Sequence, residues 1–131
     1  MVLAVLGVSW LVTPAAAHHS FVVEYDVNRP LNLEGVVTKV EWTPPHARLS
    51  LDVLEPSGTT TTWSFQMASP NVLERNGWTR RTLSVGDRVT LEGYGGFAIA
   101  TRGVVNSITT ADGRAFLAGL GPGAAVGVRA R

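Results

Sequence analysis

Two neighbouring segments near the middle of the chain alternate between apolar and polar residues, and this pattern constrains the fold more than any other feature. In residues 48–53 every second residue is Leu or Val, and in residues 61–67 the alternating positions include Trp63, Phe65 and Met67. A period of two places one set of side chains on a single face of a β-strand. We therefore expect two half-buried strands, the second of which fills the core with the rings of Trp63 and Phe65.

Turn and helix-capping residues divide the rest of the chain into further short elements. Residues 31–42 are rich in Val and Leu, and Gly35 within them indicates a bulge or a sharp bend. Ser69 can cap a helix over residues 70–76, which Gly77 ends. We also expect turns at residues 55–58 and 83–87, a fourth strand around residues 89–91, a loop at residues 93–96, a fifth strand over residues 101–110, and a hairpin turn at residues 111–113 that leads into residues 114–117.

This order of elements is that of an OB-fold, a small and partly open five-stranded barrel that binds ligands on one face and in its loops. Three strands come first, one short helix lies between strands 3 and 4, and two strands with a hairpin arm follow. We predict an all-β protein with an OB-fold-like barrel over residues 31–118. A small β-sandwich is the alternative, because a count of strands does not distinguish the two folds.

The first 17 residues carry no charged side chain and are mainly apolar, ending in Pro14 and three alanines. Such a run is typical of a signal peptide, and about a dozen apolar residues are too few to span a bilayer comfortably. We expect cleavage after residues 1–17, an N-terminal segment over residues 18–30, and a flexible tail over residues 119–131. The protein is then periplasmic or secreted, without a stable membrane span after cleavage. A retained membrane anchor and a buried N-terminal element are the alternatives.

Charge and cysteine content exclude several classes of protein. The 131-residue chain has 11 basic and 10 acidic residues, and it lacks the basic excess typical of nucleic-acid-binding proteins. It contains no cysteine, which excludes disulfides, thiolate metal sites and a cysteine nucleophile. No nucleophile, base and orienting group can be assembled by their spacing. The sequence therefore favours a binding module over an enzyme.

Several short segments in a fixed order resemble a known family. They are Ala17-His18-His19-Ser20-Phe21, Glu24-Tyr25-Asp26, residues 35–42, Pro45-His46-Ala47, residues 67–71, residues 77–80 and Gly86-Asp87. Together they resemble a family of small secreted proteins from Gram-negative bacteria, catalogued as a domain of unknown function. The resemblance implies export to the periplasm and carries no established activity. The chain departs from the family pattern at Pro44, where Asn is usual, and at Arg48, where an aromatic residue is common.

Two of the three histidines, His18 and His19, lie at the expected new N-terminus. Cleavage after Ala17 makes His18 the first residue, whose amine and imidazole can chelate one metal ion. Cleavage after Ala16 makes His19 the third residue, and the amine, two amides and imidazole then form a square-planar site for copper(II) or nickel(II). His46, in the loop after the first strand, can supply a further imidazole. The sequence thus proposes copper as a cofactor, held by His18, His19 and His46.

A ligand site without a metal is the other hypothesis. Trp42 lies at a strand end beside the loop of His46, while Ser69 and Asn71 lie at the start of the predicted helix. We expect these four residues to line a site for an unknown small molecule, or a surface for an envelope protein. Each also has a plainer structural role, such as helix capping by Ser69. Met67 could be a soft ligand for copper(I), but its position in the alternation favours the core.

Overall fold

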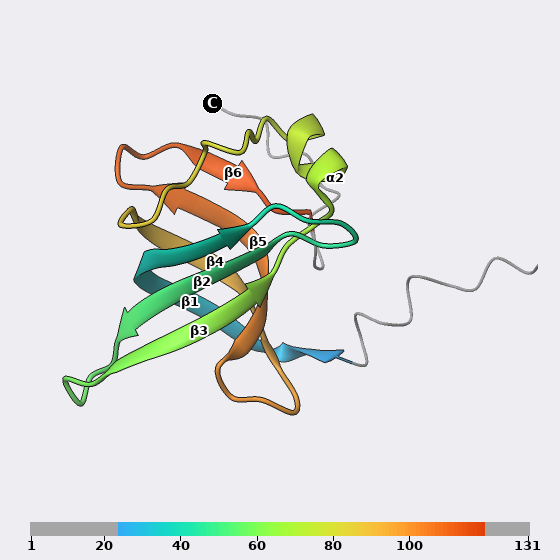
Figure 1. Cartoon of the computed structure of the whole chain (residues 1–131). Coiled ribbons are helices and arrows are strands. Elements are labelled where there is room, and N and C mark those ends of the chain that lie inside the picture. Colours follow the sequence, from blue (N-terminus) through green and yellow to red (C-terminus); the bar gives the residue numbers. More distant parts are fainter. Residues whose placement is uncertain (1–23, 120–131) are drawn as a thin grey trace, which may run out of the picture.

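The computed structural model describes residues 24–119, and strands make up most of this part of the chain (Figure 1). In chain order the elements are β1 (Tyr25–Glu41), β2 (Arg48–Leu54), β3 (Thr60–Gln66), α2 (Pro70–Arg75), β4 (Arg88–Gly96), β5 (Arg102–Thr110) and β6 (Ala115–Leu117). The prediction of an all-β protein with a short helix after the third strand is confirmed. The expected signal peptide, residues 1–17, and the expected tail beyond Gly119 lie outside the described residues. Within residues 24–119, no helix has the length and apolar character needed to cross a membrane.

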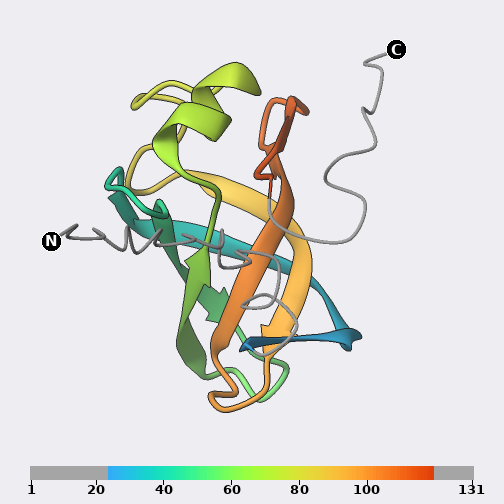
Figure 2. The same ribbon diagram turned by 90° about the vertical axis from the view of Figure 1, so that its right-hand side faces the viewer.

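The six strands form one sheet, in the order β3-β2-β1-β4-β5-β6. All neighbours in this order are antiparallel, and a further parallel pairing joins β3 to β5. The hydrogen bonds of β1, β2, β3, β5 and β4 therefore close into a ring. Helix α2 lies at one end of this ring and the start of β1 at the other (Figures 1 and 2). The alternative β-sandwich needs two separate sheets, whereas the strands of residues 24–119 form one.

Strand β1 takes part in both halves of the ring. Its residues from Tyr25 to Val36 pair with β4, and those from Val36 to Glu41 pair with β2. Gly35 lies where the partner changes, and a Cβ atom there would be 2.8 Å from the carbonyl oxygen of Asp52. Gly35, which the sequence pattern placed at a bulge or bend, therefore allows the backbones of β1 and β2 to approach closely.

The first strand begins at Tyr25, whereas the sequence pattern predicted a start at residue 31. The pairing of β1 with β4 shifts register between Asp26 and Pro30, so the residues between them form a bulge. Within this bulge the backbone N–H of Asn28 donates to the Asp26 carboxylate at 2.9 Å. A bulge breaks the period of two, which is why residues 25–30 carry no visible strand pattern.

Strand β4 runs to Gly96, so the expectation of a loop at residues 93–96 is wrong. This glycine-rich stretch pairs with β1 on one side and with β5 on the other. A Cβ atom on Gly93 would lie only 2.0 Å from the carbonyl oxygen of Val104 in β5. The glycines allow neighbouring backbones to come unusually close, and they mark a crowded part of the ring.

The core fills the interior of the ring as the alternation predicts. Phe65 and Met67 are fully buried and Trp63 is 7% exposed. The rings of Trp63 and Phe65 stack with their centroids 5.7 Å apart and their planes at 7°. Trp78 is also buried, and its indole N–H donates to the Leu117 carbonyl at 2.8 Å. The predicted inward face of the third strand is confirmed.

Candidate functional site

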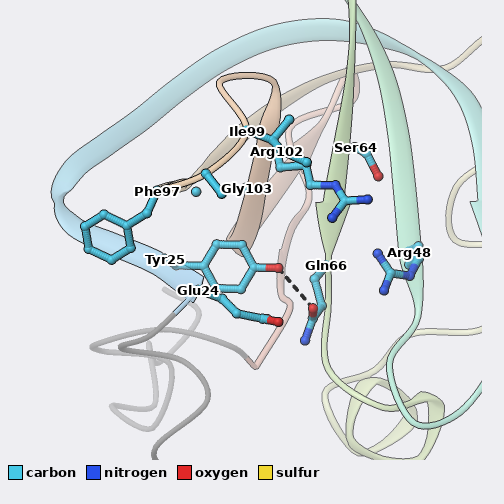
Figure 3. Close-up of a pocket in the computed structure, with 11 residues that line it drawn as sticks. Glu24, Tyr25, Arg48, Ser64, Gln66, Phe97, Ile99, Arg102 and Gly103 are labelled. Atoms are coloured by element: carbon cyan, nitrogen blue, oxygen red, sulfur yellow. Dashed lines mark hydrogen bonds between the residues drawn. The ribbon is translucent and has the colours of Figure 1, made fainter.

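A pocket of about 220 Å³ opens at the end of the ring where β1 begins (Figure 3). It is bounded by the start of β1, the start of β2, the end of β3, and the loop between β4 and β5. Its polar side chains are those of Glu24, Tyr25, Arg48, Ser64, Gln66 and Arg102.

Strand pairing explains why these polar side chains meet. Alternation in β3 places Ser64 and Gln66 on the face opposite to that of the buried Phe65. Arg48 of β2 is paired with Gln66, and Arg102 of β5 is paired with Ser64. Paired residues lie on the same face of a sheet. The pocket therefore forms on the outer face of the ring, across the strands β2, β3 and β5, near the end where β1 begins.

Two cationic groups dominate the pocket. The guanidinium groups of Arg48 and Arg102 both lie on the hydroxyl side of the Tyr25 ring (Figure 3), and neither forms an ion pair with a residue of the described part. The Tyr25 hydroxyl donates to Oε1 of Gln66 at 3.0 Å. Burial raises the pKa of Tyr25, the negative charge of Glu24 adds to this, and the two arginines partly oppose it. The Tyr25 hydroxyl therefore keeps its proton at neutral pH.

An apolar lip borders the same pocket. The loop between β4 and β5 contributes Phe97 and Ile99, which are 61% and 44% exposed. The Arg29 side chain holds this loop by donating to the Gly96 carbonyl at 3.0 Å and to the Ala100 carbonyl at 2.8 Å. The pocket thus joins a cationic wall to two solvent-exposed hydrophobic side chains on a tethered loop.

His46, which the sequence singled out, lines a second hollow of about 190 Å³. Arg48 lines this hollow too, so the two hollows share one side chain. The Nδ1 atom of His46 is buried and has no hydrogen-bond partner within residues 24–119. Trp42 is partly buried against the core and lines neither hollow. Neither Trp42 nor His46 therefore lines the main pocket, and His46 lies in a hollow that shares Arg48 with it.

Ser69 and Asn71, the other predicted ligand-binding residues, line neither of these hollows. The Ser69 hydroxyl accepts the N–H of Val72 at 3.4 Å and so caps helix α2, while Asn71 is exposed. Their segment is nevertheless a neighbour of the His46 loop, because the Ala47 N–H donates to the Ala68 carbonyl at 3.0 Å.

The predicted metal ligands His18 and His19 lie outside the described residues. Within residues 24–119, no group of three or more His, Asp or Glu side chains is arranged to hold a metal ion.

Sequence reasoning missed Gln66 and Arg102, and it noted Arg48 only as a departure from the family pattern. Tyr25 appeared only as part of a family segment. The partners of Gln66 and Arg102 come from other strands. In the sequence they are marked only by lying at polar positions of predicted strands. Ordinary surface residues lie at such positions too, so the pattern does not identify a site.

Comparison with known proteins gives one match. The model of DUF6152, a family of unknown function, matches residues 7–106, a span that contains every residue lining the main pocket. This confirms the resemblance to a domain of unknown function. No curated protein and no solved structure matches the chain.

Proposed function

The chain belongs to the DUF6152 family, and we propose that it is an exported, OB-like binding module that holds a small molecule between Arg48 and Arg102. One observation supports this above all: two guanidinium groups without an ion pair in the described part converge on one pocket. Small-molecule sites are concave and carry a few convergent polar groups. A volume of about 220 Å³ suits a small ligand.

The arrangement of strands supports the OB-like barrel. Strands β1, β2, β3, β5 and β4 pair in a ring, and helix α2 lies between the third and fourth strands of the chain. OB-folds bind ligands on one face of the barrel and in the adjoining loops. The pocket has this character, because it lies across β2, β3 and β5 and is bordered by the loop between β4 and β5.

Export to the periplasm or the surroundings of the cell is proposed from the sequence. The uncharged apolar residues 1–17 end in small residues, as cleaved signal peptides do. An exported binding module would meet small solutes of the periplasm. An envelope protein that covers the pocket is the alternative partner.

We expect small organic compounds to bind in the main pocket, and NMR titration with a fragment library tests this. Bound fragments should shift amide resonances in β2, β3 and β5 around the lining residues. Ser64→Trp fills the pocket and should weaken binding at least tenfold, or about 1.4 kcal/mol. Thr62→Trp is the matched control, because Thr62 is exposed on the same face of β3 and does not line the pocket. Fragments that bind Ser64→Trp unchanged, or that map to Trp42 and Asn71, would contradict the proposed site.

Copper binding by His18 or His19 with His46 is the second candidate function. The described chain begins at Glu24, which lines the same pocket as Arg48, and Arg48 lines the hollow of His46 as well. The five residues from His19 to Glu24 can extend about 17 Å, which supports contact with the His46 loop. The unpartnered Nδ1 atom of His46 also supports it, because a buried polar atom without a partner is unfavourable.

For this candidate we expect the correctly processed protein to bind copper(II) more tightly than zinc(II), and to lose the metal in acid because protons compete with it for the nitrogen ligands. Calorimetry and electron spin resonance measure the binding, after N-terminal sequencing has established the mature end. An added N-terminal Gly-Ser displaces the natural amine and should weaken binding. Equal, weak binding by both forms would overturn the terminal chelate. Strong binding by both that is lost in His46→Ala would move the site to the loop.

A further inference from the structure

We infer that the main pocket recognises an amphiphilic anion, with its carboxylate or phosphate group between Arg48 and Arg102 and its apolar body against Ile99. This inference rests on the binding role proposed above and names the chemical class of the ligand.

The arrangement of the arginines favours an anionic group. Arg48 and Arg102 come from different strands, point into one space, and make no ion pair within residues 24–119. Two cations that face each other repel, and an anion between them removes this repulsion. A guanidinium group presents parallel N–H donors that match the oxygens of carboxylate and phosphate. The Tyr25 hydroxyl, which keeps its proton, adds a neutral polar group at the same place.

One acidic side chain also lines the pocket, and it does not cancel the positive charge. Glu24 is exposed, and its carboxylate lies beside Tyr25 and points toward Gln66 (Figure 3). Two arginines and one glutamate leave a charge of +1 for the lining, since +2 and −1 are the only charged contributions. The pocket therefore attracts anions and disfavours cations.

The apolar lip favours an organic anion over an inorganic one. Ile99 is 44% exposed, and its carbonyl accepts the backbone N–H of Arg102 at 3.1 Å, so this apolar side chain lies next to the cationic wall although it would be more stable out of water. The Phe97 ring is 61% exposed and extends away from both guanidinium groups, on the other side of Tyr25 (Figure 3). The Arg29 side chain ties the loop to the ring through two carbonyl groups, so Ile99 is held beside the pocket. An apolar body attached to the anion would cover Ile99, which inorganic phosphate cannot do.

The test compares four probes by NMR titration and calorimetry: phenyl phosphate, benzoate, benzyl alcohol and inorganic phosphate. We expect phenyl phosphate or benzoate to bind at least tenfold more tightly than benzyl alcohol and than inorganic phosphate. Arg48→Gln and Arg102→Gln should each weaken the aromatic anions about ten- to a hundredfold, the usual effect of losing a charge-assisted hydrogen bond. Arg80→Gln is the matched control, because Arg80 is exposed and outside the pocket, and it should change affinity less than about twofold.

A further variant separates the two halves of the inference. Ile99→Ser should weaken binding of the aromatic anions and leave that of inorganic phosphate unchanged. Thermal melting of every variant establishes that it is folded.

If benzyl alcohol binds as tightly as benzoate and neither arginine variant affects binding, the inference that the ligand is an anion is overturned and the binding role is left intact. If inorganic phosphate binds as tightly as phenyl phosphate, the inference that an apolar body contributes to binding is overturned. The failure of all four probes, while other fragments still shift the pocket amides, would overturn only the ligand class. The absence of any shift at the pocket would overturn the binding role as well.

Discussion

The variant Gly93→Ala is expected to lose more than about 3 kcal/mol of unfolding free energy, because its new methyl group has no room between β4 and β5. A Cβ atom at this position would lie 2.0 Å from the Val104 carbonyl oxygen and 3.3 Å from the Cα atom of Val105. Both neighbours belong to the backbone of a paired strand, so neither can rotate aside as a side chain can. With a total stability of about 5–15 kcal/mol for a typical domain, this loss threatens folding itself.

Gly96→Ala in the same strand is the matched control. Its Cβ atom would meet its nearest neighbour at 3.4 Å, an ordinary contact, and we expect a loss below about 1 kcal/mol. Urea unfolding followed by tryptophan fluorescence measures both variants. If the two lose the same stability, then the backbones of β4 and β5 are not as close at Gly93 as described.

Phe65→Ala should cost about 3–5 kcal/mol, the usual loss for removing a fully buried aromatic ring. Phe65 is completely inaccessible, stacks on Trp63, and lies where a Cβ atom on Gly103 would come within 2.8 Å of its ring. The missing ring would leave a cavity at the point where β3 meets β5. For a domain of this size each 1 kcal/mol corresponds to about 4–8 °C, so Tm should fall by more than about 10 °C.

Leu54→Ala provides the comparison for this variant, since Leu54 lies at the end of β2 and is 71% exposed. Its unfolding free energy should change by no more than about 0.5 kcal/mol. Calorimetry of the two variants gives Tm directly. A Phe65→Ala protein that melts with the wild type would mean that the inward face of the third strand is wrongly assigned.

Local patterns were sufficient for the elements in the middle of the chain. Strands β2 and β3 follow from the period of two in their sequences. Helix α2 follows from its Ser69 cap and from Gly77, the glycine expected to end it, which has a φ of 88° in the structure. The start of β1 and the end of β4 were missed for a common reason. The start of β1 contains a bulge, and the end of β4 contains glycines that lie very close to β5. Both features depend on the neighbouring strand, which a local sequence pattern does not reveal.

The candidate site was less predictable than the fold. Sequence reasoning favoured residue types that are rare in this chain, such as His46 and Trp42, because their chemistry is distinctive. Arginine in an alternating strand is normally surface charge. Arg48 and Arg102 become a site only because β2 and β5 both pair with β3. Helix α2 and strand β4 lie between β3 and β5 in the sequence, so no local sequence pattern predicts their parallel pairing.

The pairing of β3 with β5 also involves the fewest residues of any pairing in the ring. It joins three residue pairs, whereas β1 and β4 are joined by nine. Local opening of a protein begins where few backbone hydrogen bonds hold an element. Ser64 and Gln66 lie on one side of this junction and Arg102 on the other, so separation of the two strands would dismantle the pocket. An occupant that touches both strands would therefore hold the ring shut and slow amide hydrogen exchange there. Binding of such an occupant and opening of the ring at β3–β5 would then oppose each other.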